Sequence, residues 1–522
     1  MIDIDALTTV GAVSRSNARR APDRACNVFE GQVTTFAEFD ARCDRVANAL
    51  AAVGASRVAY LGKNCDLVTE VFVGTTRAGG IFAPINWRLA PPEIAAILGG
   101  FDPQLLFVGP EFVGAVEAIG DGLPAGLTVL AMEGGHPSWP DYEAWRDAHD
   151  ASAMEERSGP DGPALVLFTS GTTGVPKGAM LSHENLLGQR RETPRDLPYD
   201  HWRDDDVSLM AMPLAHIGGI GWWLIAFENA CPSVIAREFD PSKVVDFIER
   251  DRVSKLFIVP AALQFIVRHP RAREADFSRI DMICYGAAPM PLQLLREAMD
   301  VIGCGFLQAY GLTETTGTIA MLLPEDHVRE GSPRMRSAGR AVPGSEIRVV
   351  GPDGNVLPPG EIGEVAIRGG TVMLGYLNNP EATADVLSPD GWLRSGDAGY
   401  LDEDGYLTIH DRIKDMIISG GENVYPAEVE NAIFGHPDVN EVAVIGVPDD
   451  RWGEAVKAVV SPRDGRQVDE PSLIAWTRER LAAFKCPKTV DVVDALPRNA
   501  TGKVLKRELR KRYWADRERQ VN

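Results

Sequence analysis

The sequence predicts an α/β fold with a large N-terminal domain of mixed and parallel sheets, flanked by helices, and a small, mobile α+β C-terminal domain. Through most of the chain, short apolar runs alternate with helical stretches, and after Asp411 the pattern changes to a compact unit of about 110 residues. A chain of 522 residues is also long for one domain, so two or more units are expected. The boundary is predicted to separate residues 1–411 from residues 412–522.

Several runs of the large domain are apolar on both faces, a pattern typical of parallel strands that helices cover. These predicted strands lie at residues 58–61, 105–108, 164–168, 256–260 and 281–285. In the small unit, the pattern predicts a helix from Pro426, strands from Glu441 and from Ala455, and a helix from Pro471.

Composition argues against some classes of partner. The chain is 45% hydrophobic with a formal net charge of −21, which argues against a nucleic-acid partner and weakens binding to an anionic membrane. The seven cysteines are scattered without a C-x-x-C pair, as buried thiols of a reducing compartment would be. The N-terminus has no signal-peptide pattern and no apolar run is long enough to span a bilayer, so a cytoplasmic enzyme is expected, with peripheral membrane contact and a homodimer left open.

A glycine-rich loop, FTSGTTGVPKG at residues 168–178, has the chemistry of a phosphate cradle. Glycines let backbone N–H groups approach anionic oxygens, hydroxyl groups add donors, and a lysine adds charge. The lysine follows a proline, so the loop is not a Walker P-loop, and an ordinary polar turn is the weaker alternative. The predicted phosphate-binding residues are Thr169, Ser170, Gly171, Thr172, Thr173, Gly174 and Lys177.

Further motifs follow in a fixed order. They are MPLAHIGG from Met212, CYGAAPMP from Cys284, QAYGLTETTG from Gln308, RSGDAGYLDEDGYL from Arg394, DRIKDMIISGGENVYPAEVE from Asp411 and PRNATGKVLKREL from Pro497. With the glycine-rich loop, this series resembles the adenylate-forming superfamily of acyl-CoA synthetases, peptide-synthetase adenylation domains and firefly-type luciferases. The resemblance covers about residues 160 to 510, and the first 160 residues match more loosely.

The resemblance implies roles for a few charged residues. Lys503 matches the lysine that reaches the carboxylate and α-phosphate during adenylation, Thr313 the α-phosphate contact, and Glu314 the Mg²⁺-binding carboxylate. An anionic nucleophile attacking a phosphate needs cations where charge accumulates, which suits these residue types. Lys503 could instead be a solvated member of the basic tail, and Glu314 alone a surface acid.

The resemblance also implies a nucleotide site. Small residues would face the base edge, an aromatic ring would stack on adenine, and Asp397 and Arg412 would bind the ribose hydroxyls. The other residues of this set are Gly286, Ala287, Ala288, Tyr310 and Gly311. Taken alone, Asp397 could cap a turn and Tyr310 could belong to the core.

A hinge and two binding regions complete the predicted site. Lys414 matches the family's hinge, and Gly420 and Gly421 match the loop beside the pantetheine tunnel, although a plain glycine turn is an alternative. The acyl pocket is expected at His216, Gly218, Gly219 and Trp222. His216 matches the residue at the mouth of the carboxylate tunnel and is expected, with Lys503 and Thr313, to be catalytic; Ala215 stands where the family usually has an aromatic residue. Core packing explains Trp222 equally well.

These inferences predict an ATP-dependent carboxylate–CoA ligase that uses ATP, Mg²⁺ and coenzyme A. A medium- or long-chain fatty acid is the first choice of substrate, with aryl acids and sterol side-chain acids as alternatives. An enzyme that loads a carrier protein is less favoured, because no carrier segment with a phosphopantetheine serine follows Lys503. A non-catalytic relative would be expected to lose at least one of Lys177, Glu314, Asp397 and Lys503.

Overall fold

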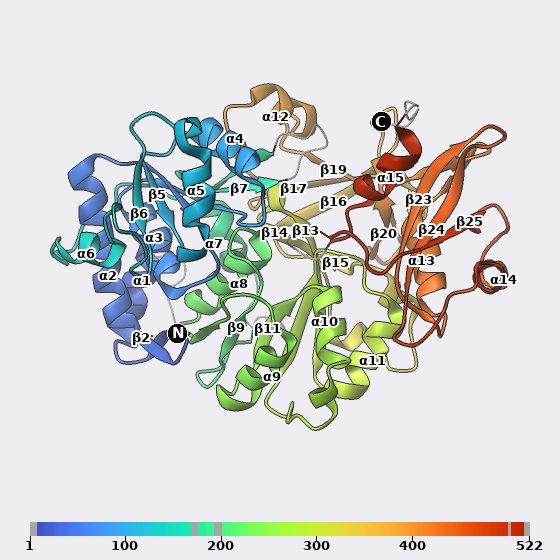
Figure 1. Ribbon diagram of the computed structural model, residues 1–522, viewed down its shortest axis with the longest axis horizontal. Coiled ribbons are helices and arrows are strands. Elements are labelled where there is room, and N and C mark those ends of the chain that lie inside the picture. The colour runs from blue at the N-terminus through green and yellow to red at the C-terminus, as the bar shows by residue number, and fades with distance from the viewer. Residues whose placement is uncertain (1–7, 170–175, 193–200, 499–502, 516–522) are drawn as a thin grey trace.

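A computed structural model describes residues 8–169, 176–192, 201–498 and 503–515. A large domain, blue through yellow to light orange in Figure 1, is followed by a small domain in deeper orange and red. The predicted fold class is confirmed. No helix among the described residues is long and apolar enough to cross a membrane.

Two large sheets form the frame of the large domain. Within the described residues, one has nine strands in the order β15-β14-β13-β12-β11-β9-β10-β1-β2, and the other seven in the order β18-β8-β7-β4-β3-β5-β6. The strands of the first are β15 (Arg340–Ala341), β14 (Gly317–Leu322), β13 (Gly305–Leu312), β12 (Met282–Gly286), β11 (Lys255–Ile258), β9 (Ser208–Met210), β10 (Ser233–Ile235), β1 (Ala25–Phe29) and β2 (Gln32–Thr35). The strands of the second are β18 (Gly375–Tyr376), β8 (Lys177–Ser182), β7 (Pro163–Thr169), β4 (Ile81–Ile85), β3 (Arg57–Leu61), β5 (Leu105–Val108) and β6 (Thr128–Ala131).

Each of the five predicted strands of the large domain is present, as β3, β5, β7, β11 and β12. The pairs β3·β4, β3·β5 and β11·β12 are parallel, which agrees with the apolar composition of both faces. The helices of this domain are α1 (Val10–Arg20), α2 (Phe36–Val53), α3 (Asp66–Arg77), α4 (Pro91–Phe101), α5 (Val113–Ile119), α6 (Tyr142–Asp147), α7 (His183–Glu192), α8 (Ile217–Glu228), α9 (Pro241–Arg250), α10 (Pro260–Val267), α11 (Leu292–Ile302) and α12 (Pro380–Val386).

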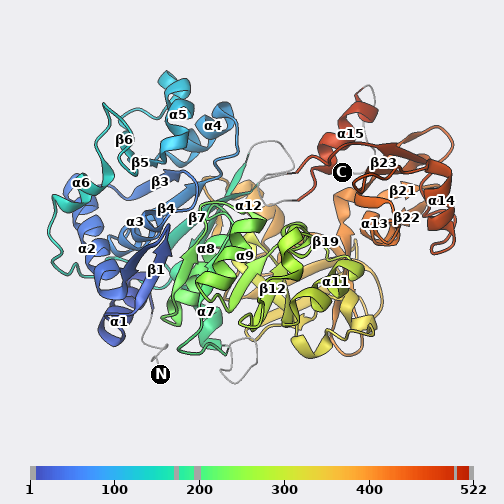
Figure 2. The same ribbon diagram turned by 60° about the horizontal axis from the view of Figure 1, so that its bottom comes forward.

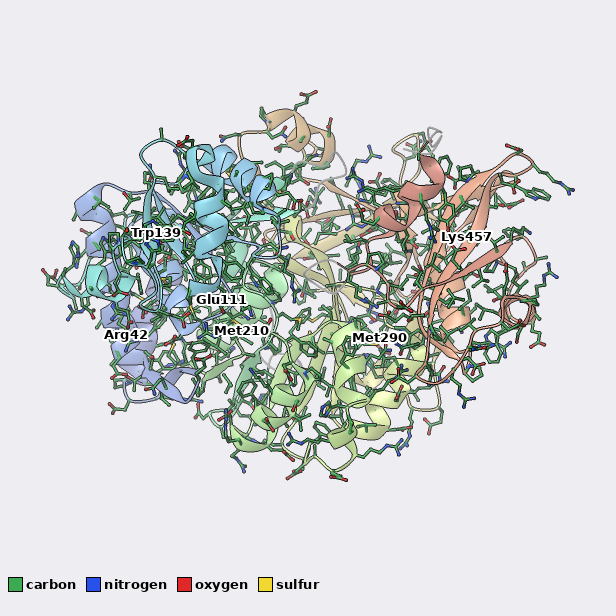
Figure 3. All side chains as sticks on the ribbon, in the orientation of Figure 1. Arg42, Glu111, Trp139, Met210, Met290 and Lys457 are labelled. Carbon is green, nitrogen blue, oxygen red and sulfur yellow. The ribbon has the colours of Figure 1, made fainter. Side chains whose placement is uncertain are left out.

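Helices α1, α2, α3 and α8 share one apolar core with strands of both large sheets. Their arrangement beside the sheets can be followed in Figure 2. Helix α2 shows how the sequence determines where such a helix begins and ends. Thr35 and Glu38 form a capping box at its start, and Gly54 ends it in the left-handed conformation at φ 67°. In Figure 3 side chains fill the space between the elements, and Met210, at the end of β9, is 1% exposed.

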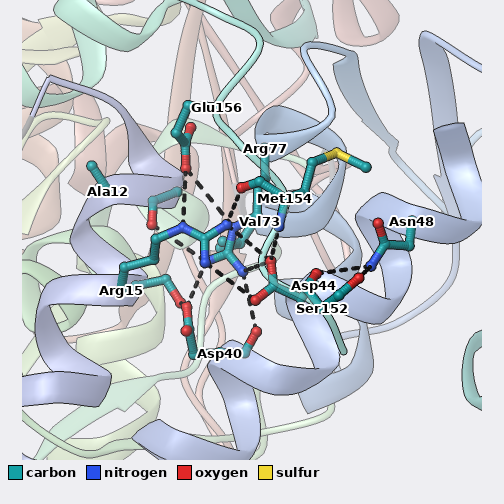
Figure 4. Close-up of polar contacts among 12 residues, drawn as sticks. Ala12, Arg15, Asp40, Asp44, Asn48, Val73, Arg77, Ser152, Met154 and Glu156 are labelled. Atoms are coloured by element: carbon teal, nitrogen blue, oxygen red, sulfur yellow. Dashed lines mark hydrogen bonds and ion pairs between the residues drawn. The ribbon is translucent and has the colours of Figure 1, made fainter. Parts of the chain in front are cut away.

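A buried ion-pair cluster ties the N-terminal helices together (Figure 4). The guanidinium of Arg77, at the end of α3, is fully buried and lies 2.5 Å from Asp40 and 2.8 Å from Asp44, both on α2. Glu156, in the segment that leads to β7, lies 3.9 Å from the same guanidinium. Opposite charges surround Arg77, so its burial in the core is compensated.

An antiparallel sheet connects the large domain to the small one. It has the order β16-β17-β19-β20 within the described residues, and its last strand runs into the linker. Its strands are β16 (Ser345–Val350), β17 (Gly363–Gly369), β19 (Leu393–Leu401) and β20 (Leu407–Arg412).

The small domain packs helices on a five-stranded sheet, counted over the described residues. Its strands are β21 (Ile417–Ser419), β22 (Glu422–Val424), β23 (Val439–Asp449), β24 (Gly453–Pro462) and β25 (Thr489–Val492), and its helices are α13 (Pro426–Phe434), α14 (Glu470–Arg478) and α15 (Lys506–Trp514). The predicted helices and strands of this unit correspond to α13, β23, β24 and α14.

Candidate active site

The phosphate loop connects two antiparallel strands, β7 and β8, whose facing ends are Thr169 and Lys177. The hydroxyl of Thr169 is 3.4 Å from the carbonyl oxygen of Lys177, so the two ends of the loop lie together. Ser170, Gly171, Thr172, Thr173 and Gly174 lie outside the described residues. The expected role of the whole loop stays a prediction.

Lys177 and Glu314, which are far apart in sequence, meet at Tyr376. The Lys177 ammonium lies 5.1 Å from the centre of the Tyr376 ring. The Tyr376 hydroxyl donates a 2.8 Å hydrogen bond to Glu314 Oε1, and burial followed by the charge of Glu314 raises the pKa of Tyr376. Sequence reasoning missed Tyr376, because only the pairing of β18 with β8 brings it to this place.

Glu314 and Thr313 begin a short 3₁₀ helix, Thr313–Thr315, directly after β13. Among the described residues there is no cluster of three or more side chains able to hold a metal ion. Mg²⁺ is usually held by one or two carboxylates, water and substrate phosphates, so the single carboxylate of Glu314 beside the phosphate loop fits this ion.

The small residues expected at the adenine edge lie at the last position of β12, which is Gly286, and directly after it. A Cβ on Gly286 would lie 2.2 Å from the carbonyl oxygen of Ala309, so only glycine allows β12 and β13 to approach this closely. Ala287 has φ 64°, a left-handed conformation that is uncommon for a residue with a side chain. Such local strain often occurs at ligand-binding loops.

Tyr310, Asp397 and Arg412 form one hydrogen-bonded group. Tyr310 donates to Asp397 Oδ2 at 2.6 Å, and the Arg412 guanidinium lies 2.8 Å from Asp397 Oδ1. Burial and then the charge of Asp397 raise the pKa of Tyr310. Gly311 is also constrained, because its Cβ would overlap the carbonyl oxygen of Gly317 at 1.4 Å.

Lys503 of the small domain lies near this group. Lys503 is exposed as a residue, but its ammonium group has lost much of its solvent. This loss, followed by the charge of Arg412, lowers the pKa of Lys503, whereas the charge of Asp397 raises it. Three residues further on, Lys506 pairs with Glu430 at 2.8 Å and with Asp411 at 3.6 Å. These two pairs hold the start of α15 against helix α13, which carries Glu430, and against the end of β20, which carries Asp411, and so keep the segment of Lys503 close to the predicted ribose site.

The expected hinge lies in a 3₁₀ turn, Ile413–Asp415, which directly follows β20. Gly420 and Gly421 form the two-residue turn of the β21–β22 hairpin, with φ of 64° and 87°. Positive φ at both positions favours glycine in such turns. A Cβ on Gly420 would lie 2.7 Å from the Trp452 ring, so packing also restricts this position.

The residues expected in the acyl pocket lie at the start of α8. Asn64 holds the preceding loop, since its side chain bonds Met212, Leu214 and Ala236 at 2.9–3.1 Å. His216 is the N-cap of α8, and burial followed by the charge of Arg88 lowers its pKa to about 4, so it is neutral at pH 7.

Gly218 and Gly219 have different surroundings. A Cβ on Gly218 would lie 2.7 Å from Cε1 of Phe257, a ring that sequence reasoning did not identify. A Cβ on Gly219 would lie 2.2 Å from the carbonyl oxygen of Pro213. A side chain at Gly219 would therefore displace backbone, whereas one at Gly218 would meet an aromatic ring. The role of both glycines in acid binding stays a prediction.

A cavity of about 340 Å³ opens beside the same loop. Met212 and Pro213 line it from the loop, Trp87 and Arg88 from the turn between β4 and α4, and Arg498 from the small domain. The cavity does not include the nucleotide residues, but it reaches the backbone just before His216. This geometry suits the entrance for a second substrate better than the adenine site.

This fold and site define an adenylate-forming acid–thiol ligase. The AMP-binding enzyme family matches residues 14–377, and the AMP-binding enzyme C-terminal domain matches residues 428–503. The chain belongs to the AMP-binding enzyme family, and it is an AMP-forming acid–thiol ligase. The boundary at residue 411 falls between the two matches and stays a prediction.

Relatives and solved structures agree with this assignment. The chain is 39% identical to a fatty acid–[acyl-carrier-protein] ligase of Streptomyces coeruleorubidus, over 99% of this chain and 98% of the relative. It is 41% identical to a feruloyl-CoA synthase of an Amycolatopsis species, over 95% and 97%. It also resembles the crystal structure of ATP-bound MatB from Rhodopseudomonas palustris, with a TM-score of 0.85, 32% identity, and coverage of 97% of this chain and 99% of that one.

Proposed function

We propose that this protein is an ATP-dependent carboxylate–CoA ligase that works in two steps. In the first, a carboxylate oxygen attacks the α-phosphorus of ATP, the bond to the β-phosphate breaks, and pyrophosphate leaves. In the second, the thiol sulfur of CoA attacks the acyl carbon, AMP leaves with the bonding electron pair, and the thiol proton is lost. The observation that carries this proposal is the group in which Tyr310 and Arg412 hold Asp397, together with the ion pairs of Lys506 that keep the segment of Lys503 next to the end of β20.

The residues at this site suit the first step. Tyr310 would support adenine while its hydroxyl holds Asp397, whose carboxylate would accept hydrogen bonds from the ribose. Lys177 and Lys503 would stabilise the negative charge that develops on the phosphate oxygens. Glu314, together with those oxygens, would hold Mg²⁺, which neutralises phosphate charge.

In the second step Lys503 would have to leave the site so that the thiol of CoA can reach the acyl carbon. We propose that the small domain turns about Lys414, which would withdraw Lys503 and bring the hairpin of Gly420 and Gly421 toward the large domain. The cavity lined by Met212, Pro213 and Arg498 supports this proposal, because it could admit a thin thiol arm from outside the nucleotide site.

The acid stays a prediction. A medium- or long-chain fatty acid is the candidate expected from the sequence, and the named activity of the Streptomyces relative supports a fatty acid. An aryl acid is the second candidate, because Phe257 and Trp222 place aromatic rings next to the first glycine of α8. The named activity of the feruloyl-CoA synthase supports it too.

The test is a two-part assay with the purified chain. Acid-dependent pyrophosphate release across fatty, aryl and short-chain acids measures the first step. Mass spectrometry then compares thioester formation with CoA and with a phosphopantetheinylated carrier protein. Thioester on CoA is expected. Transfer to the carrier protein alone would contradict the CoA assignment, and no pyrophosphate release with any acid would contradict the ligase proposal.

A further inference from the structure

Tyr376 lies between two residues of opposite charge at the predicted ATP site. The ammonium of Lys177 lies over its ring, 5.1 Å from the ring centre, and its hydroxyl donates a 2.8 Å hydrogen bond to Oε1 of Glu314. Tyr376 is only 8% exposed, so most of the surrounding water is excluded from these contacts. One neutral side chain therefore contacts a cation with the face of its ring and an anion with its hydroxyl.

The pairing of β18 with β8 explains why the ring reaches Lys177. In this antiparallel pair, Tyr376 lies opposite Ala179. Lys177 is two residues before Ala179, so the side chains of Lys177 and Tyr376 point to the same face of the sheet, and diagonal neighbours of this kind are within reach of long and aromatic side chains. The backbone N–H of Leu377 donates to the carbonyl oxygen of Gly178 at 2.8 Å, which continues the pairing toward the phosphate loop.

Helix α12 fixes the backbone of Tyr376. The N–H of Tyr376 donates to Oγ1 of Thr383, on α12, at 2.9 Å. The preceding residue, Gly375, has φ 139°, and a Cβ there would lie 2.9 Å from the methyl carbon of Thr383, so strand and helix pack too closely for a side chain at this position. Three residues before Tyr376, the N–H of Met373 donates to the carbonyl oxygen of Glu314 at 2.9 Å. The segment of Tyr376 is thus bound both to α12 and to the turn that carries Glu314.

The contacts of Tyr376 take the place of a direct ion pair between Lys177 and Glu314. Opposite charges in a partly buried site attract one another strongly, and a direct pair would occupy both the ammonium expected to bind phosphate and the carboxylate expected to bind Mg²⁺. Breaking a buried ion pair is strongly unfavourable. A cation–π contact and a hydrogen bond from a neutral hydroxyl are weaker, so phosphate oxygens and Mg²⁺ can replace them more easily.

We propose, on the basis of the ligase activity proposed above, that Tyr376 is a positioning residue that keeps Lys177 and Glu314 from pairing with each other before ATP binds. The ammonium of Lys177 then remains available for phosphate oxygens, and the carboxylate of Glu314 for Mg²⁺. Tyr376 acts through these two residues and needs no contact of its own with the substrate. Loss of its hydroxyl alone should allow Glu314 to pair with Lys177.

A double-mutant cycle on ATP binding tests this role. The dissociation constant of ATP is measured by isothermal titration calorimetry without acid or CoA, once with Mg²⁺ and once with EDTA. Tyr376→Phe keeps the ring and removes the hydroxyl, so it should raise this constant about tenfold in both conditions. In the Glu314→Gln background, where no carboxylate can capture Lys177, the same substitution should raise it by less than about twofold.

Tyr406→Phe is the matched control. Tyr406 is 6% exposed, and its hydroxyl donates at 2.9 Å to Asp326, a carboxylate without a predicted role in ATP binding. This variant should leave the dissociation constant of ATP unchanged. If Tyr376→Phe weakens ATP binding equally with and without the carboxylate at Glu314, or does not weaken it at all, the inference is overturned while the ligase activity stands. The expected cycle without pyrophosphate release for any acid would support the inference and contradict the ligase proposal.

Discussion

The hydroxyl of Tyr310 donates a 2.6 Å hydrogen bond to Oδ2 of Asp397, which joins strand β13 of a large sheet to strand β19 of the sheet that leads to the small domain. The same carboxylate is held by Arg412 at 2.8 Å. Both of its oxygens therefore have fixed directions before any nucleotide binds. This preorganisation reduces the ordering cost of binding a ribose.

Tyr310→Phe should weaken ATP binding while keeping the ring that supports adenine. Losing a hydrogen bond to a charged group costs about 1.5–3 kcal/mol, so KM for ATP should rise by about tenfold or more. Tyr310→Leu, which removes the ring as well, should raise it further. Steady-state kinetics with varied ATP measures both variants, and an unchanged KM in Tyr310→Phe would show that the hydrogen bond does not orient Asp397 for ATP.

Lys503→Ala should abolish acid-dependent pyrophosphate release but largely spare thioester formation from supplied acyl-adenylate. The reason is that the lysine stabilises charge only while the carboxylate attacks the phosphate. Lys511, on the exposed part of α15 and paired with Glu508, provides the control, since Lys511→Ala should leave both steps intact. Equal loss of both steps in Lys503→Ala would indicate a structural role.

Asn440 connects the two domains. Its side-chain oxygen lies 3.1 Å from Gln264 Nε2 and 3.2 Å from Arg268 Nη1, both on or next to α10. Asn440→Asp should strengthen the contact with Arg268 and so slow thioester formation relative to adenylation. Asn440→Ala and Gln264→Ala should act in the opposite direction. Single-turnover rates of each step measure this, and identical ratios in all three variants would contradict a domain rotation that breaks this contact.

His183 makes stability depend on pH. Its Nδ1 accepts a hydrogen bond from the Val10 backbone at 3.2 Å, and burial lowers its pKa from 6.5 to about 4. The pKa of His183 is lower in the folded protein than in the unfolded chain, so the unfolded chain binds the proton first as the pH falls. The stability that is present above pH 6.5 is therefore lost progressively as the pH falls toward 4. The loss is about 1.4 kcal/mol per pH unit. Thermal unfolding from about pH 4 to 8 should therefore show a shallower acid slope for His183→Asn, and parallel curves would contradict this.

Arg77 should be important for stability. Arg77→Met leaves Asp40 without its buried cation and leaves Asp44 with Arg15 alone, so it should cost up to about 3–5 kcal/mol. Arg57→Met is the control, because Arg57 pairs with Asp102 in a contact whose side chains are 37% and 62% exposed and should cost less than about 1 kcal/mol. Urea unfolding of both variants measures the difference. Equal midpoints would show that the buried cluster contributes no more than a surface pair.

The class of fold and most of the predicted chemical groups could be inferred from the sequence alone. Apolar runs on both faces predict β3, β5, β7, β11 and β12 because burial on two sides is a local property of composition. The ordered motifs predict roles for Lys503, Asp397 and Glu314 through their resemblance to the family, and these roles stay predictions; their charges suit the chemistry that the resemblance implies.

Which of these groups meet, and what surrounds them, depends on the three-dimensional arrangement of the chain. Tyr376 reaches Glu314 through the pairing of β18 with β8. Phe257 of β11 lies against Gly218 of α8, although the two residues are far apart in the sequence. Gly218 and Gly219 look equivalent in the sequence, yet one faces a ring and the other a backbone carbonyl. The physical reason is that contacts between residues distant in the chain depend on close packing in three dimensions, which a local pattern does not encode.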